Sequence, residues 1–570
     1  MIGIISKTNQ AAVVEEFFEL FKTPWEFYRP GRAYDVVVAS ADEVSEVGTK
    51  LLVVYGSAAK SIDGRIGIVA GGRQQCAILS DGNISLPIYG DLLTFENSNN
   101  GTSCVTAGSQ IAGVRVEVRD SAVIRLGYDL FDQVGFLLST GQPIEHAHIP
   151  TLDIHIRMLR DWILNEGIPL LEIPPTPAGH SFAVCLTHDI DFVGIRNHKF
   201  DHTMWGFVYR ATVGAVVNLF RGRISMGQLV KCWRAVPSLP LVYAGWAKDF
   251  WEPFEWYLEV EKGLATTYFL IPFKGRAGEQ VPGAHASWRA VAYEVDDLSH
   301  WTGRLKAAGC ELGVHGIDAW HSAEKGRAEL AKIAEISGES NIGIRMHWLL
   351  RDANTISVLE QSGYSYDSTM GYNETIGYRS GTAQVFRPLS AKTLLEIPLH
   401  IQDGALFYPQ RLDLSEAEAE KRCQALIDNA GEFGGVLTLL WHDRSHGPER
   451  FWGDFYLRLV QQLKSSDSWF ATASQAAGWF RKRREMRFEW LADGNGVRTI
   501  LASEGEKNLP LLNLRVYRPS IARDDVRPSS SATPTLVDIP WDGRTAVEFD
   551  SSLSRISDLP VAMSASEISR

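Results

Sequence analysis

The sequence predicts an α/β protein whose main domain is an irregular (β/α) barrel of about seven strands. An N-terminal α/β accessory domain precedes the barrel and a small C-terminal β-rich module follows it. Apolar strand-like segments alternate with amphipathic helical segments from residue 182 to 484. The chain also begins with a β-α-β pattern, "IGIIS", a helical segment at 11–22 and "YDVVVAS". With 570 residues, 45% of them hydrophobic, it is long enough to bury more than one core.

The domain boundaries follow changes in this pattern. We expect an accessory domain at 1–150, a linker at 151–180 that includes "EIPPTPAG", and the barrel at 181–486. The strand-like segments after the barrel predict a β module at 487–520, and the polar, Ser/Pro-rich end predicts a mobile tail at 521–570. The accessory domain has no glycine-rich nucleotide motif where a strand meets a helix, so we assign it no nucleotide.

Composition excludes several classes of protein. The net charge of -12 repels nucleic-acid phosphates, so we expect no nucleic-acid partner. The six cysteines are scattered without a CxxC pair, which predicts neither a zinc ribbon nor a disulfide framework.

No segment predicts a signal peptide or a transmembrane helix. Lys7 and nearby acidic residues interrupt the N-terminus, and no apolar run reaches the roughly 18 residues that span a bilayer. The nearest, "MWGFVYRATVGAVVNLF" at 204–220, is too short and carries Arg210. We therefore expect a cytoplasmic protein, although 204–223 is suited to peripheral contact with a membrane surface.

The alternation of strands and helices predicts an α/β domain. Seven or eight strand–helix units favour a barrel over an open sheet. Chemistry in such barrels sits where the strands end. The expected strands are 182–189, 265–271, 310–315, 341–347, 364–368, 393–398, 435–442 and 468–472, and the clearest helices are 296–308, 323–336, 353–362 and 415–430.

Titratable residues recur at the ends of these strands. Asp189 and Asp191 are two positions apart on an extended chain, so their side chains share one face. A single strand-end histidine is more often a structural hydrogen-bonding group, but repeated instances at one edge indicate a site. The other members are His315, Asp318, His321, Arg345, His347, Asp367, His442, Asp443 and Arg444.

A carboxylate and two imidazoles are the ligand set of an open metal site. Zinc is the most common occupant, and cobalt, nickel or manganese also accept these donors. A second aspartate beside the set is able to act as a general base, and a histidine across the site as a general acid.

Five segments in order, "LTHDID", "GVHGIDAWH", "IRMHW", "YDST" and "LTLLWH", resemble the motifs of polysaccharide deacetylases (carbohydrate esterase family 4). The resemblance covers about 182–484. The segments "YDLFDQVGFLL" and 371–388 resemble a long bacterial branch of the family with an accessory N-terminal domain. The resemblance implies metal-dependent removal of acetyl groups from sugars.

The resemblance also implies roles for individual residues. Asp189 is expected to be the base, and Asp191 and His315 metal ligands. The family spacing His-x3-His would place the third ligand at Ala319, which has no donor atom. We expect His321 in its place, with Asp318 and His347 as the alternatives.

The remaining motifs supply the other groups. Arg345 is expected to orient the base, His442 to be the general acid, and Asp367 to hold the acid histidine or line the site. We expect Trp348 and Trp441 to pack in the core. Substrate contacts are expected from a glycine-rich loop that contains Tyr372, Asn373, Tyr378 and Arg379.

Three functional hypotheses follow. The leading one is a deacetylase of N-acetylated sugars in a polysaccharide, a glycan or a lipid-linked precursor; a cytoplasmic location favours the precursor. A hydrolase of another C–N bond in a small amide is the second, favoured if the insertion at 192–262 closes the cleft to polymers. The third is a non-catalytic glycan-binding or scaffold protein that has lost the metal, which the altered histidine spacing leaves open.

Overall fold

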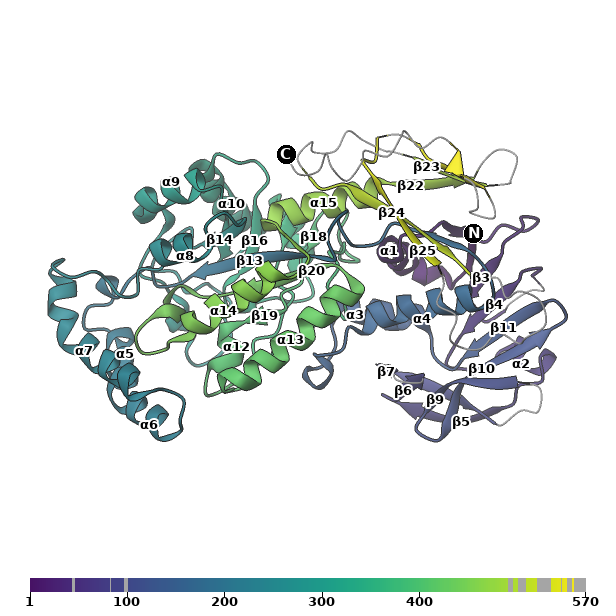
Figure 1. Ribbon diagram of the computed structural model, residues 1–570, viewed down its shortest axis with the longest axis horizontal. Helices are drawn as coiled ribbons and strands as arrows, with labels where there is room; N and C mark the ends of the chain where they lie inside the picture. Colours follow the sequence, from purple (N-terminus) through teal and green to yellow (C-terminus); the bar gives the residue numbers. More distant parts are fainter. Residues whose placement is uncertain are drawn as a thin grey trace. The chain divides into compact units, whose positions relative to one another are not determined.

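The chain folds into two compact units in a computed structural model (Figure 1). We call them the N-terminal unit (Met1–Gln142, Ile149–Ala178 and Gly478–Arg570) and the barrel unit (Pro143–His148 and Gly179–Ala477). The structure describes residues 1–43, 47–81, 84–96, 101–490, 496–500, 509–519, 535–544, 546–550 and 556–557.

An 11-stranded mixed sheet forms the centre of the N-terminal unit. Strands β1, β3, β4 and β11 are parallel neighbours and almost fully buried, as their apolar sequences predict. The strands are β1 (Ile2–Ile5), β2 (Trp25–Phe27), β3 (Val36–Ala39), β4 (Leu51–Tyr55), β5 (Ala70–Gln75), β6 (Ile78–Asp81), β7 (Ile84–Pro87), β8 (Asp91–Phe95), β9 (Gly101–Ala107), β10 (Gln110–Val118) and β11 (Ser121–Leu126). The helices are α1 (Ala11–Phe21), α2 (Ser61–Arg65), α3 (Leu130–Ser139) and α4 (Thr151–Asn165).

Two smaller sheets complete this unit. One joins β12 (Leu170–Glu172), β24 (Leu512–Arg518) and β25 (Thr535–Trp541), and the other joins β22 (Arg487–Trp490), β23 (Gly496–Ile500), β26 (Glu548–Asp550) and β27 (Ile556–Ser557). The segment 151–180, expected as a linker, therefore contains α4 and β12. β24, which lies in the segment expected as a separate module at 487–520, pairs with β12 of the N-terminal unit. Most of the expected tail, 521–570, lies outside the described residues.

The barrel unit contains a curved sheet of parallel strands in the order β18-β17-β16-β15-β14-β13-β20-β19, with β21 also pairing with β13. This order confirms the predicted α/β class with an irregular barrel. The strands are β13 (Phe182–Ile190), β14 (Thr266–Leu270), β15 (Glu311–Gly316), β16 (Gly343–Met346), β17 (Tyr366–Asp367), β18 (Leu395–Glu396), β19 (Ile401–Gln402), β20 (Val436–Leu440) and β21 (Ser468–Phe470). The short β19 was not predicted, since two residues are too few for a periodic pattern.

Helices alternate with these strands, as the sequence pattern predicts. Ser322 caps α10 by accepting a hydrogen bond from the Lys325 amide, and Ser415 caps α13 in the same way at Glu418. The helices are α9 (Ser299–Ala307), α10 (Ala323–Ser337), α11 (Thr355–Ser362), α12 (Asp403–Phe407), α13 (Glu416–Phe433), α14 (Trp452–Ser465) and α15 (Ala473–Glu485).

A helical insertion, residues 192–262, separates β13 from β14 (Figure 1). It comprises α5 (His202–Tyr209), a π-helical segment (Arg210–Gly214), α6 (Ala215–Phe220), α7 (Met226–Tyr243) and α8 (Phe254–Val260). It has a small core of its own, which includes Phe207, Leu229 and Trp251. In the described part of the chain, no helix is long and apolar enough to cross a bilayer.

Candidate metal centre and active site

The carboxyl end of strand β13 positions both aspartates of the predicted site, because Asp189 lies within the strand and Asp191 directly follows it. Side chains alternate between the two faces of a strand, so Asp189 and Asp191 point one way and His188 points the other. Asp189 and Asp191 both line a cavity of about 920 Å³ in the barrel unit. The polar strand end is therefore the edge of a cavity.

His188, on the opposite face, has a structural role. Its Nδ1 lies 2.9 Å from the Trp441 carbonyl oxygen, and its Nε2 lies 2.8 Å from Glu261 Oε1. The imidazole is fully buried, with its ring centroid 3.8 Å from that of Tyr257. A buried polar group that is hydrogen-bonded at both ends costs little, so this histidine joins β13 to β20 and α8.

Asp191, His315 and His347 form a group that is able to hold a metal ion. The Oδ1 atom of Asp191 lies 3.3 Å from His315 Nε2 and 3.5 Å from His347 Nε2. Zinc–ligand distances of about 2.0–2.2 Å at tetrahedral angles place neighbouring ligand atoms about 3.3–3.5 Å apart. The two distances from Asp191 therefore match those around a shared cation, and all three ligand atoms lie within 4.8 Å of one another.

The hydrogen-bonding pattern independently fits a cation. His315 Nδ1 lies 3.0 Å from the Arg345 carbonyl oxygen, which only accepts, so the proton sits on Nδ1 and Nε2 presents a lone pair. That lone pair faces the Asp191 carboxylate. Asp191 Oδ1 is buried and has no hydrogen-bond partner among the described residues. Two facing lone pairs repel each other unless a positive charge lies between them.

Burial and charge favour the ligand forms of two of these groups. Burial of Asp191 tends to raise its pKa, but its interactions with the neighbouring imidazoles of His347, His315 and His442 outweigh burial and lower the pKa. Burial is the main cause that lowers the pKa of His347 well below its ordinary value. A deprotonated carboxylate and a neutral imidazole are the forms that bind metals.

The third member of the group is His347, whereas the sequence analysis favoured His321. The chain leaves β15 at Gly316, and His321 lies on the following loop, where its Nε2 is 3.0 Å from Asp318 Oδ1. Asp318, an alternative ligand, also accepts a hydrogen bond from the Glu279 amide. His321 and Asp318 thus pair with each other and do not join Asp191 and His315. His347 follows directly after β16, the neighbour of β15, and so lies beside His315.

The backbone after His347 has an uncommon conformation. Trp348 and Leu349 have φ angles of 67° and 53°, in the left-handed region that non-glycine residues rarely adopt. Such conformations are found at functional sites, where the surrounding structure holds them in place. Here the turn places Trp348 on the wall of the cavity rather than in the core, where the sequence analysis expected it.

Arg345 fixes the remaining aspartate. Its Nη1 donates to Asp189 Oδ1 at 3.0 Å and to Thr187 Oγ1 at 2.7 Å, while its Nε donates to the Ser368 carbonyl oxygen at 3.0 Å. The guanidinium is fully buried, with its central carbon 4.6 Å from the centre of the Phe269 ring. Because every branch of Arg345 is held, Asp189 is held in one orientation, with Oδ2 3.8 Å from His315 Nε2.

His442 lies across the cavity and is held by Asp403. Its Nδ1 is 2.5 Å from Asp403 Oδ1, and its backbone amide donates to Asp403 Oδ2 at 2.9 Å. Burial alone lowers the pKa of this imidazole, but the charges of Asp403, Asp191 and Asp189 raise it to about 10. A protonated histidine at neutral pH is a proton donor.

Asp403 was missed by the sequence analysis, which expected Asp367 to hold the acid histidine or line the site. Asp367 is instead buried beneath the sheet edge, hydrogen-bonded to Thr369 and facing Glu396, and burial raises its pKa. The sequence signal for Asp403 was weak, since it begins the five-residue helix α12 rather than following a long strand.

The expected substrate residues separate into two groups. Asn373 lines the cavity and donates to the Trp348 carbonyl oxygen at 3.0 Å. The other three are engaged elsewhere: Tyr378 is buried in the core, Tyr372 is buried, and Arg379 donates to the Gly371 carbonyl oxygen. Trp288, exposed on the cavity wall and stacked on His202 of the insertion, was not predicted.

Similarity to known proteins is found in the fold and not in the sequence. No family model matches the chain, and no curated protein matches it. Similar solved structures include a putative polysaccharide deacetylase from Mycobacterium smegmatis (19% identity, TM-score 0.32, covering 54% of this chain and 95% of that one). They also include Puue allantoinase (15%, 0.31, covering 54% and 92%) and a probable polysaccharide deacetylase from Pseudomonas aeruginosa PAO1 (16%, 0.31, covering 54% and 94%).

The structures to which this chain is similar are thus polysaccharide deacetylases and an allantoinase by name. Sequence identity and TM-score are low in each case. The functional assignment therefore depends on the geometry of the site.

The ligand assignment is tested by comparing two histidines. Replacing His347 with alanine (His347→Ala) removes one of three donors, so we expect bound zinc to fall from about one ion per chain to near zero. His321→Ala, the matched control, is expected to keep the metal. Metal content is measured by mass spectrometry after dialysis; loss of zinc in His321→Ala with retention in His347→Ala would reverse the assignment.

Proposed function

We propose that this protein is a metal-dependent hydrolase, related to the polysaccharide deacetylases, that removes acetyl groups from N-acetylated sugars. The observation that carries the proposal is one cavity in which an Asp–His–His donor set lies beside an aspartate held by Arg345 and a histidine held by Asp403. Asp191, His315 and His347 would hold the ion with three protein ligands and would leave a coordination position for water or substrate, as in catalytic metal sites.

The bound metal would polarise the acetyl carbonyl and lower the pKa of a water beside it. Asp189, aimed by Arg345, would accept the proton of that water as it attacks the carbonyl carbon. His442 would then donate its proton to the departing amine nitrogen, which is otherwise a poor leaving group. Asp403 keeps the His442 imidazole oriented and charged for this step.

The cavity walls suit a sugar. Trp288 and Trp348 present exposed aromatic rings beside the polar groups, and such rings stack on sugar faces. The complete donor set favours an enzyme over a scaffold that has lost its metal. The insertion, which contributes Thr203 and Gly206 to the wall, narrows the cavity and favours a short glycan or precursor over a long polymer.

The base is tested together with the substrate class. We expect the wild-type enzyme to release acetate from short chito-oligosaccharides, and Asp189→Asn to retain its zinc while losing about 10²–10⁴-fold in kcat. Acetate is measured by an enzyme-coupled assay, with small amides such as ureides assayed in parallel. Turnover of the amides but not of the sugars would replace the proposal with the alternative C–N hydrolase, and undiminished turnover by Asp189→Asn would reject its role as base.

The acid is tested through the pH profile. Asp403 raises the pKa of His442, so Asp403→Asn is expected to lower that pKa and to bring the alkaline limb of the kcat profile to lower pH. Below the new limb the variant still holds a protonated His442 and turns over. An alkaline limb at the same pH in both proteins would show that His442 is not the proton donor.

A further inference from the structure

We infer that the substrate of this cavity carries a phosphate group, bound by Arg210, Arg444 and Arg450 beside the candidate metal centre. The inference rests on the proposed function and names the substrate class for the same site. The three arginines come from two segments that lie far apart in the sequence, the π-helical segment of the insertion and the loop after β20. All three line the cavity that contains the metal ligands.

Acidic side chains neutralise this cluster only in part. Glu449 Oε1 lies 3.8 Å from Arg210 Nη2, and this is the ion pair that the described residues provide for the three guanidinium groups. Asp443, next to Arg444, accepts hydrogen bonds from the backbone amides of Phe192 and Val193. One side of the cavity therefore carries an excess of positive charge.

The arginines also keep donors available. The Nε and Nη2 atoms of Arg210 are buried, and in the described part of the chain neither has a hydrogen-bond partner. The Arg444 guanidinium is placed by stacking, with its central carbon 3.8 Å from the centre of the Phe192 ring. Arg450 uses one nitrogen to donate to the Tyr408 hydroxyl at 2.7 Å. Buried donors without partners are costly unless a ligand satisfies them.

The pKa values of neighbouring groups report the same positive potential. Burial of Tyr408 raises its pKa, but the charges of Arg450, Arg444 and His442 outweigh this and lower it to about 7. Burial, with the charges of Arg450 and Arg444, lowers the pKa of Arg210 to about 10. An anion placed among these groups relieves both effects.

Phosphate is the anion that these donors fit best. Guanidinium groups present planar forks of N–H donors that match phosphate oxygens, and they bind such groups where an ammonium would act only as a point charge. A second cavity of about 1120 Å³ shares Arg210, Tyr408 and Arg450 with the first and continues along α6. This arrangement would fit a substrate with its sugar at the metal centre and its phosphate at the arginines. A further substituent would extend into the second cavity.

Two sources of phosphate are compatible with this geometry, a sugar linked to a lipid diphosphate and a sugar linked to a nucleoside diphosphate. The binding of inorganic pyrophosphate tests the subsite without reference to catalysis. We expect the metal-free full-length protein to bind pyrophosphate by calorimetry, with the Kd raised about tenfold or more in Arg210→Gln and in Arg444→Gln. Arg304→Gln, a surface arginine outside the cavity, is the matched control and is expected to bind as the wild type does.

Acetate release then separates the sources. A prenyl-diphosphate-linked N-acetyl sugar, a nucleoside-diphosphate N-acetyl sugar and a neutral chito-oligosaccharide are compared, and we expect one of the two phosphorylated substrates to have the lower KM. If none of the three substrates releases acetate, the proposed function is wrong. Pyrophosphate binding that depends on the arginines would still support the phosphate subsite. Pyrophosphate binding that is absent, or unaffected by Arg210→Gln and Arg444→Gln, overturns the phosphate subsite.

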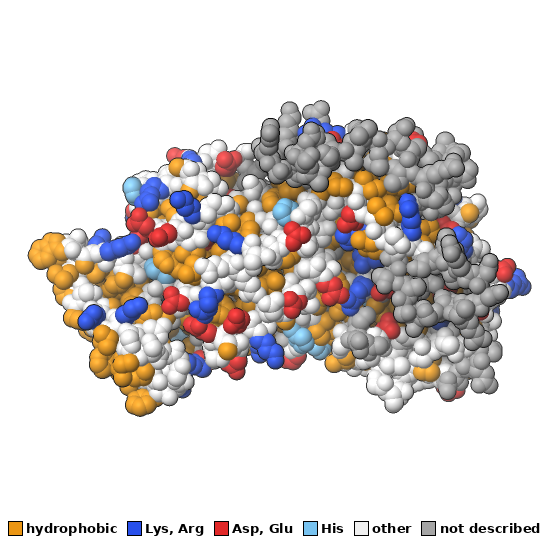
Figure 2. Space-filling model, viewed as in Figure 1, with side chains coloured by type: hydrophobic (Ala, Val, Ile, Leu, Met, Phe, Trp, Pro, Cys, Tyr) orange, Lys and Arg blue, Asp and Glu red, His pale blue; other side chains and the backbone are white. Residues whose placement is uncertain are grey.

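A separate set of residues leads to a second proposal: the helical insertion docks on the surface of an anionic lipid bilayer through α5, α6 and α7. Large apolar side chains of these helices and the turns after them face solvent, including Phe220 at 87%, Trp246 at 83% and Tyr209 at 62% exposure. Figure 2 shows orange side chains gathered at the left end of the molecule, where Figure 1 places these helices. An exposed apolar surface of this kind marks an interaction site.

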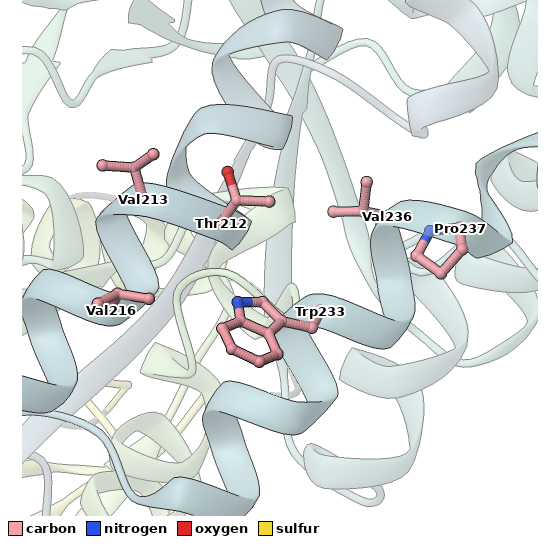
Figure 3. A pocket seen from close by; sticks show the side chains of 6 residues that line it. All are labelled: Thr212, Val213, Val216, Trp233, Val236 and Pro237. Atoms are coloured by element: carbon pink, nitrogen blue, oxygen red, sulfur yellow. The ribbon is translucent and has the colours of Figure 1, made fainter.

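An apolar groove lies between the helices of the insertion. It has a volume of about 390 Å³ and is lined by side chains of the π-helical segment, α6 and α7 (Figure 3). The lining residues are Thr212, Val213, Val216, Trp233, Val236 and Pro237. A groove without charged side chains suits an acyl chain.

The positive charge of the insertion favours an anionic lipid surface as its partner. Between His202 and Lys248 the sequence contains no Asp or Glu, in a chain whose net charge is -12. A second copy of this surface would bring like charges together, whereas anionic headgroups attract them. The exposed basic residues of this stretch are Arg221, Arg223, Lys231, Arg234 and Lys248.

Vesicle flotation tests this proposal with the full chain. We expect the wild type to bind phosphatidylcholine vesicles that contain phosphatidylglycerol, and to bind pure phosphatidylcholine vesicles much more weakly. The exposed positions Phe220 and Trp246 are replaced together (Phe220→Ser with Trp246→Ser), and we expect the partition coefficient to fall about tenfold or more. Ile144→Ser, an exposed apolar residue outside the insertion, is the matched control and is expected to bind as the wild type does.

Binding that does not depend on phosphatidylglycerol, or that survives the double substitution, overturns the membrane proposal. The proposal is also overturned if the wild type does not bind vesicles but forms a dimer, seen by analytical ultracentrifugation, that the double substitution dissociates. That result would assign the apolar surface to a second copy of the chain.

Discussion

The site depends on the parallel register of β13, β14, β15 and β16. In this register His315 lies directly opposite Arg345, and the strands on either side end at the same edge of the sheet. Arg345 makes two hydrogen bonds in this frame: its backbone carbonyl fixes the His315 tautomer, and its side chain fixes Asp189. The ligand and the expected base are therefore positioned by one residue.

Much of this arrangement could be predicted from sequence, because strand ends in a parallel sheet are spatial neighbours whatever their separation in the chain. Asp189, Asp191, His315 and His442 were identified in this way, and the structure brings them to one cavity. The choice between His321 and His347 could not be made so simply. It depends on where the chain leaves β15 and on a left-handed turn after β16, which no local pattern encodes.

Residues outside the periodic segments were harder to find. Asp403 and Trp288 lie in short or irregular segments, and their functional placement depends on long-range packing. Arg210 was read from sequence only as a charge that interrupts an apolar run, yet it lies on the cavity wall. The insertion thus presents apolar and basic side chains to solvent and Arg210 to the cavity, an arrangement suited to the two proposals, in which a phosphorylated substrate is bound beside a membrane surface.

The central claim is that Asp191, His315 and His347 share one metal ion. X-ray absorption at the metal edge of the purified full-length protein tests it most directly, in the wild type and in His315→Ala. The account predicts a first shell of imidazole nitrogen and carboxylate oxygen at about 2.0–2.2 Å in the wild type, which disappears in the variant. A sulfur-containing shell, or an imidazole signal that persists in His315→Ala, would place the metal elsewhere and contradict the account.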